Sequence, residues 1–165
     1  MRLVEGVAAV DDVAPFVDGL AAIGREHDVV VQAFDARYVA GEAHLAAAVR
    51  AARRAREHDD TIADDPGVEV LLYAAGRRQI DRALAIGVSP GEGPVVVVVD
   101  GAGADEAAAA AAVAAHLEPA ETLGAARDEA AIRDYFAVGD AELAATDASL
   151  EALVVERVAL LAVDK

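Results

Sequence analysis

The chain has 165 residues, 56% of them apolar, and a formal net charge of -16. This length is enough to bury a core, so we expect one domain over residues 1–165. The absence of cysteine excludes disulfides, thiol chemistry and cysteine-ligated zinc, and no apolar stretch is long enough for a membrane span. Acidic residues follow the start of the chain too closely for a signal peptide, so we expect a cytoplasmic protein with no membrane partner.

Hydrophobic patterning predicts the elements of the first half of the chain. The β-branched run at 29–34 is typical of a strand, while residues 41–57 have the apolar spacing of an amphipathic helix. The run at 68–75 is rich in β-formers and stops at Gly76, which predicts a buried strand. The other expected elements are an edge strand at 1–5, a helix at 11–24, a polar loop at 58–67 and a helix at 77–86 with Ile80, Ala83 and Leu84 turned inward.

The second half begins with the clearest strand, the valine run at 95–99. Helices are expected at 104–116, at 128–136 and over most of 141–163, with a break near 146–149. Residues 120–124 show no strand pattern. We therefore expect an α/β (α+β-like) fold, a single compact domain in which a small mixed sheet of about four strands packs with about six helices.

A glycine pair after the valine run makes nucleotide binding one alternative. The loop Gly101-Ala102-Gly103 would follow a strand and open a helix, as in dinucleotide sites. Glu106 stands at the position of the third glycine, and acids at a helix start repel phosphate while favouring the helix dipole. A small α/β nucleotide-binding enzyme that uses residues 95–103 is therefore the alternative function.

Residue types that usually perform catalysis are sparse. The four histidines are scattered, and no two have metal-ligand spacing on one helix. Neither Ser89 nor Ser149 lies in the strand–turn–helix context of a nucleophilic serine. We expect no catalytic residue, no bound metal and no cofactor.

Arginines gather in one part of this acidic chain. Residues 37–82 contain eight arginines and eight acidic residues, so this stretch is locally neutral. The guanidinium fork can donate two parallel hydrogen bonds to a phosphate, and its plane can stack on bases. Pairing within the chain, such as Arg77 with Asp81, is the alternative. The cluster predicts a negatively charged partner.

The last helix is apolar on nearly every side. One stripe combines Leu150, Leu153, Val154, Val158 and Leu161, and the far side is apolar as well. Such a helix is either buried or docked on another protein. We expect a protein partner here, with packing in the chain's own core as the alternative.

These segments together resemble a known family. Their order is FDARYVAGEAHLAAAVRAA, EVLLYAAGRRQIDRALAIGV, PVVVVV and LVVERVALLAV. The order resembles the small subunit of the KEOPS complex, the PRPK-binding protein family, which binds the kinase-like ATPase of that complex. The similarity covers most of the chain and is most specific at residues 75–80 and 156–160.

The resemblance implies a non-catalytic accessory subunit in tRNA threonylcarbamoylation of the adenosine next to the anticodon. Such a subunit docks on the kinase-like ATPase and helps recruit tRNA through its 3′ CCA end, while a purely structural adaptor without RNA contact is the alternative. Gly76 and Ile80 match the family's glycine-to-helix junction. The residues expected to bind tRNA are Arg37, Arg50, Arg54, Arg77, Arg78, Gln79 and Arg82. Those expected to bind the protein partner are Leu150, Leu153, Val154, Arg157, Val158 and Leu161.

The balance of charged residues suggests the host. There are 30 acidic against 14 basic residues, and Lys165 is the only lysine. A hydrated acidic surface with arginine in place of lysine is typical of a salt-loving archaeon, so the chain resembles a haloarchaeal member of the family. A high-GC genome is the alternative explanation.

Overall fold

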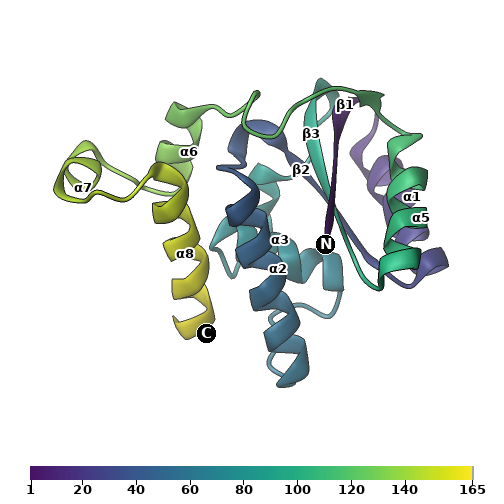
Figure 1. Cartoon of the computed structure of the whole chain (residues 1–165), viewed down its shortest axis with the longest axis horizontal. Helices are drawn as coiled ribbons and strands as arrows, with labels where there is room; N and C mark the ends of the chain where they lie inside the picture. Colours follow the sequence, from purple (N-terminus) through teal and green to yellow (C-terminus); the bar gives the residue numbers. More distant parts are fainter. Residues whose placement is uncertain (165) are drawn as a thin grey trace.

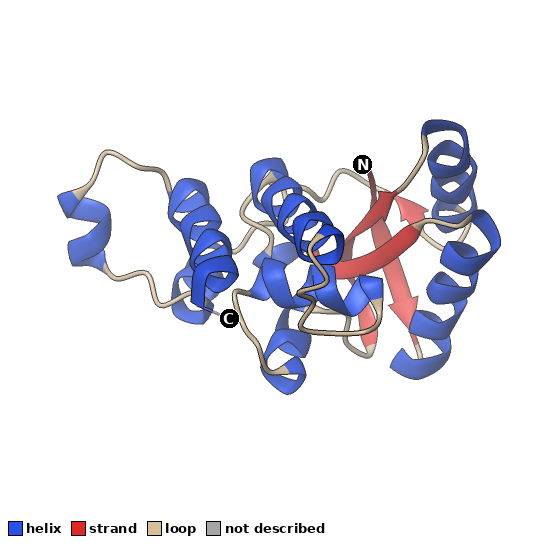
Figure 2. Cartoon of the chain, turned by 90° about the horizontal axis from the view of Figure 1, so that it is seen from below, coloured by secondary structure: helices blue, strands red, loops and turns tan. Residues whose placement is uncertain are grey.

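A four-stranded sheet in the order β2-β3-β1-β4 separates two groups of helices in the computed structural model, which describes residues 1–164 (Figures 1 and 2). β3 pairs antiparallel with β1 and β2, and β4 pairs antiparallel with β1, so the sheet is antiparallel rather than mixed. The first strand lies between two others, and its prediction as an edge strand was wrong. The strands are β1 (Arg2–Val10), β2 (Val30–Asp35), β3 (Gly91–Asp100) and β4 (Glu118–Pro119).

The valines of β3 point alternately to the two faces of the sheet. Val96 and Val98 join the core under one group of helices, while Val95, Val97 and Val99 join the core under the other. Side chains alternate across a strand, so an unbroken valine run requires both faces to be covered. The prediction of an interior strand at 95–99 is therefore confirmed.

One face of the sheet is covered by α1 (Val13–His27) and α5 (Gly103–Ala114), which lie to the right in Figure 1. Leu20 and Val113 are among the side chains that these helices bury against the strands. Both helices were expected from the sequence, within three residues at each end.

The opposite face is covered by a thicker helical layer. α2 (Glu42–Glu57) and α3 (Pro66–Ala75) lie nearest the sheet, and α8 (Leu150–Asp164) packs against both of them (Figure 1). α6 and α7 lie farther out, and the interruption between α7 and α8 confirms the predicted break near 146–149. The remaining helical elements are η1 (Ala36–Tyr38), α4 (Ile80–Ala83), η2 (Leu84–Ile86), α6 (Glu129–Tyr135) and α7 (Asp140–Ala145).

Residues 68–75 form a helix, so the predicted strand was wrong. The Asp65 carboxylate accepts from the backbone N–H groups of Gly67 and Val68 at 2.8 and 3.0 Å, and Pro66 occupies the first turn of α3. Gly76, with φ 61°, ends the helix in the left-handed conformation. α3 is buried along almost its whole length, so it lacks the polar face that reveals a helical period.

The expected helix at 77–86 is shorter and more open than the sequence suggested. It consists of the single turn α4 followed by the 3₁₀ turn η2. Ala83 is buried as expected, but Ile80 is 49% exposed and Leu84 is 56% exposed. The inward orientation predicted for those two side chains was wrong, and both belong to the surface.

Candidate functional site

The apolar stripe of α8 lies inside the protein. Leu153, Val154, Val158 and Leu161 are all buried, and Leu150 is half-buried against the same core. The expectation that these side chains face a partner is therefore corrected: they contact α2, α3 and α6 of their own chain, which was the alternative the sequence left open.

Arg157, the one charged residue of that predicted set, also has internal partners. Its Nε and Nη2 donate to the carbonyl oxygens of Phe136 and Ala137, both at 3.1 Å. Its Nη1 and Nη2 donate to the two carboxylate oxygens of Glu142 at 2.6 and 2.8 Å. The hydrogen bond to Glu142 raises the pKa of the Arg157 guanidinium. Arg157 therefore ties α6 and α7 to α8.

A different set of apolar side chains is exposed. Leu160 is 49% and Val163 is 79% exposed on the outer side of α8. Because the sequence of this helix is apolar on nearly every side, it did not show which side is buried. The Arg78 Nη1 donates to the carbonyl oxygen of Asp164 at 3.3 Å, which brings the start of α4 next to the end of α8. We call Ile80, Leu84, Leu160 and Val163 the outer apolar surface.

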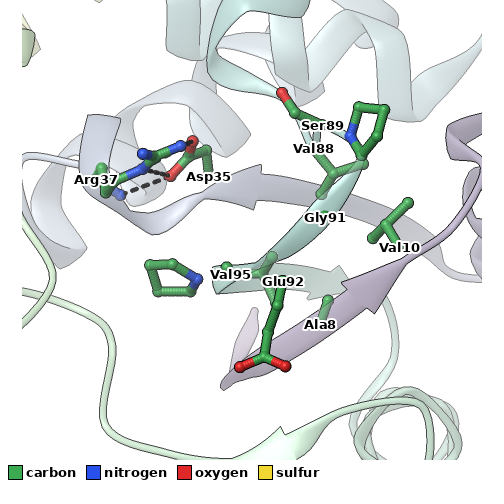
Figure 3. Close-up of a pocket in the computed structure, with 12 residues that line it drawn as sticks. Ala8, Val10, Asp35, Arg37, Val88, Ser89, Gly91, Glu92 and Val95 are labelled. Atoms are coloured by element: carbon green, nitrogen blue, oxygen red, sulfur yellow. Dashed lines mark hydrogen bonds and ion pairs between the residues drawn. The ribbon is translucent and has the colours of Figure 1, made fainter.

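Arg37 is bound to a neighbouring carboxylate. Its Nε and Nη2 donate to Asp35 at 3.0 and 2.6 Å, and this hydrogen bonding raises the pKa of Arg37. Figure 3 shows the pair at one side of a hollow of about 50 Å³ where β3 begins. Asp35 thus neutralises Arg37, which makes it a weaker anion site than the sequence suggested.

Arg77 lies against the end of α6. Its Nη2 donates to the carbonyl oxygen of Tyr135 at 2.6 Å, and its guanidinium lies 5.0 Å from the centroid of the Tyr135 ring. The Tyr135 hydroxyl donates to the carbonyl oxygen of Arg82 at 2.9 Å, and the rings of Tyr38 and Tyr135 lie 6.0 Å apart. The segment after Gly76 is therefore fixed to α6.

Several other arginines have no carboxylate partner among residues 1–164. Arg50 and Arg54 lie one turn apart on α2 with exposed side chains, whereas Arg53 between them donates to both carboxylate oxygens of Asp100. The sequence did not separate the paired arginines from the unpaired ones, because pairing depends on contacts between distant elements. On α2 and around α4, we call the exposed arginines without a carboxylate partner among residues 1–164 the open arginines: Arg50, Arg54, Arg56, Arg78 and Arg82. Gln79, also exposed, precedes α4.

The glycine loop after β3 is occupied by a carboxylate. The backbone N–H of Gly101 donates to Glu106 Oε2 at 3.0 Å, and Asp100 lies at the same end of the strand. A phosphate at this helix start would have to displace Glu106 and approach a second acid. The structure therefore argues against the nucleotide-binding alternative at residues 95–103.

No group of three metal-ligating side chains lies together in the part of the chain that the structure describes. His44 is fully buried and hydrogen-bonded to backbone groups. The same described residues contain no helix with the length and apolar character needed to cross a membrane.

The fold and these surfaces define a small α+β protein that offers exposed arginines and apolar side chains near the ends of α2, α4 and α8. The chain belongs to the family of CGI-121 kinase binding proteins, whose sequence pattern matches residues 10–162. Membership makes it a kinase-binding accessory protein and agrees with the family resemblance seen in the sequence. A comparison with curated proteins found no match.

Proposed function

We propose that this kinase-binding protein is the non-catalytic subunit of a KEOPS-type complex and that it helps bring tRNA to the complex through the 3′ CCA end. One observation carries the RNA part of this proposal. In a chain of net charge -16, arginines on α2 and around α4 are exposed and have no carboxylate partner among residues 1–164. Such groups suit the phosphates and bases of a single strand.

The outer apolar surface is the part we assign to the kinase partner. Ile80 and Leu84 lie one turn apart, and Leu160 and Val163 lie on the helix whose end contacts Arg78. Exposed apolar side chains on two neighbouring segments are typical of protein interfaces. This assignment replaces the buried stripe of α8 that the sequence suggested.

The RNA part is assigned to residues whose side chains are exposed and not held in an ion pair with a described residue. Arg50 and Arg54 on α2, and Arg78, Gln79 and Arg82 around α4, can donate to phosphate or base edges without breaking an ion pair. Arg37 is already paired with Asp35, so we expect a smaller effect from its removal.

The test uses the complex reconstituted with this chain and a transcribed tRNA that ends in CCA. Replacing Arg50, Arg54 and Arg78 together by alanine should weaken tRNA binding about tenfold or more, because the effects of losing several phosphate contacts on the binding constant multiply. The matched control is Arg25→Ala, another exposed arginine without a carboxylate partner among the described residues, on the α1 side of the sheet. Unchanged tRNA binding by the triple variant would support the purely structural adaptor instead.

A further inference from the structure

Two guanidiniums bind successive carbonyl groups at the C-terminal end of α6. Arg77 donates to the carbonyl oxygen of Tyr135, and Arg157 donates to the carbonyl oxygens of Phe136 and Ala137. The backbone beside Arg77 also lies close to Arg157, because a Cβ built on Gly76 would lie 3.5 Å from the Cβ of Arg157. A helix C-terminus favours cations, which explains why both can gather here.

Among residues 1–164, the carboxylate of Glu142 is the only one bound to either arginine. It accepts two hydrogen bonds from Arg157, and Arg77 has no carboxylate partner within residues 1–164. Glu142 belongs to α7, which has no buried residue and projects from the rest of the protein (Figures 1 and 2). The ion pair is open to solvent, since the side chains of Arg157 and Glu142 are 23% and 35% exposed.

We propose that Arg77 and Arg157 form a phosphate site at the end of α6, which the Glu142 carboxylate occupies in the free protein and an RNA phosphodiester takes over on binding. The proposal rests on the RNA-binding function proposed above and adds a site with its own internal competitor. In this proposal Arg157 binds α7 through Glu142 in the free protein and becomes available to RNA when α7 moves away.

The exchange is physically reasonable because the two anions make the same contacts. A guanidinium group can donate two parallel hydrogen bonds to a carboxylate or to a phosphate with the same geometry. Because a phosphate would accept the same two hydrogen bonds and the pair is partly exposed to solvent, exchanging Glu142 for a phosphate requires little net energy. α7 is otherwise held by the ion pair between Arg133 and Asp140 and by partial packing of Leu143, so it can move without disturbing the core.

The test compares two substitutions that remove the same charge from α7. Glu142→Gln removes the competitor from Arg157, whereas Asp140→Asn removes the partner of Arg133 and serves as the matched control. In the reconstituted complex, Glu142→Gln should tighten binding of CCA-ended tRNA about two- to fivefold beyond the Asp140→Asn variant. The gain should vanish when Arg157→Gln is added, in a variant whose folding is checked by its thermal unfolding.

Amide hydrogen exchange measures directly whether Glu142 and α7 are displaced from Arg157. Addition of tRNA to the wild-type complex should speed amide hydrogen exchange in residues 139–146, since α7 loses its tie to α8. Equal tRNA affinity of the Glu142→Gln and Asp140→Asn variants, or exchange in this segment that stays the same with tRNA, overturns the phosphate site while leaving the RNA-binding function intact. If tRNA binding survives the combined replacement of Arg50, Arg54 and Arg78, the proposed RNA-binding function itself has failed.

Discussion

The imidazole of His44 and the carbonyl oxygen of Ala74 are joined by a hydrogen bond of 2.7 Å that links the start of α2 to the end of α3. The other ring nitrogen, Nδ1, accepts from the backbone N–H of Ala40 at 3.2 Å, so Nε2 is the protonated nitrogen of a neutral ring. Phe136 packs edge-on against this ring, with the centroids 5.5 Å apart. Burial lowers the pKa of His44 to about 4.

The first prediction is that stability falls as the pH drops below neutral. With a pKa of about 4 when folded and about 6.5 when unfolded, His44 binds its proton more readily in the unfolded chain. Its contribution is therefore complete above pH 6.5 and is lost between pH 6.5 and 4, a change of about 3 kcal/mol in all. Urea unfolding at pH 7 and pH 5 should show about 2 kcal/mol of this loss.

The control for this prediction is His44→Gln, which keeps a side-chain N–H near Ala74 but cannot titrate. The variant should be less stable at pH 7 and should lose much less stability between pH 7 and 5. The same pH dependence in both proteins would show that other groups, not His44, govern it.

A second prediction concerns Glu69, a fully buried carboxylate on α3. It accepts from the backbone N–H groups of Ile62 at 3.0 Å and Ala63 at 2.7 Å, and so fixes the loop before α3. Glu69→Gln should lower the free energy of unfolding by about 2 kcal/mol. The amide loses the charge-assisted hydrogen bonds and places its own N–H group against the backbone N–H groups of this loop. Glu26→Gln, an exposed position on α1, should change that free energy by less than about 0.5 kcal/mol.

Ala137 offers a substitution that should stabilise the protein. It follows α6 with φ 54°, a left-handed conformation that a side chain disfavours. Ala137→Gly should raise the free energy of unfolding by about 1 kcal/mol, measured by urea denaturation. The same change at Ala108, exposed within α5, should lower it by about 1 kcal/mol. A loss of stability in both variants would contradict the argument.

The last prediction separates the two sides of α8. Leu153→Asp places a carboxylate in the core and should unfold the domain, since Leu153 is only 4% exposed. Leu160→Asp on the outer side should leave thermal unfolding almost unchanged and weaken binding of the kinase partner at least about tenfold. A folded Leu160→Asp protein that binds the kinase normally would exclude this face as the interface.

Most of the secondary structure could be predicted from local patterns. The strand at 29–34, the helix at 41–57 and the valine strand were evident because half-buried helices and β-branched runs have clear periods. The helix at 66–75 was missed because the apolar run hid its period. Its ends did carry a signal, since Asp65 before Pro66 is a helix start and Gly76 is a helix end.

The candidate site was harder to predict than the fold. Sequence pointed to α8 and to the arginines of α2 and of the segment around α4, but it could not decide which side of α8 faces outward or which arginines meet a carboxylate. Arg53 and Arg54 are neighbours in sequence, yet only Arg53 has a carboxylate partner among the described residues, because Asp100 at the end of β3 lies next to it. Such pairings are set by the packing of distant elements, which local spacing does not reveal.

The contact between Arg77 and Tyr135 also gives the protein an optical signal of its own. The chain has three tyrosines and no tryptophan, so phenol emission is not masked by indole. Tyr73 is sealed in the core, whereas Tyr135 lies beneath a guanidinium and near the ring of Tyr38. Two of the three tyrosines lie at this junction, so changes in the ultraviolet fluorescence of the unlabelled protein report on the end of α6 without a dye.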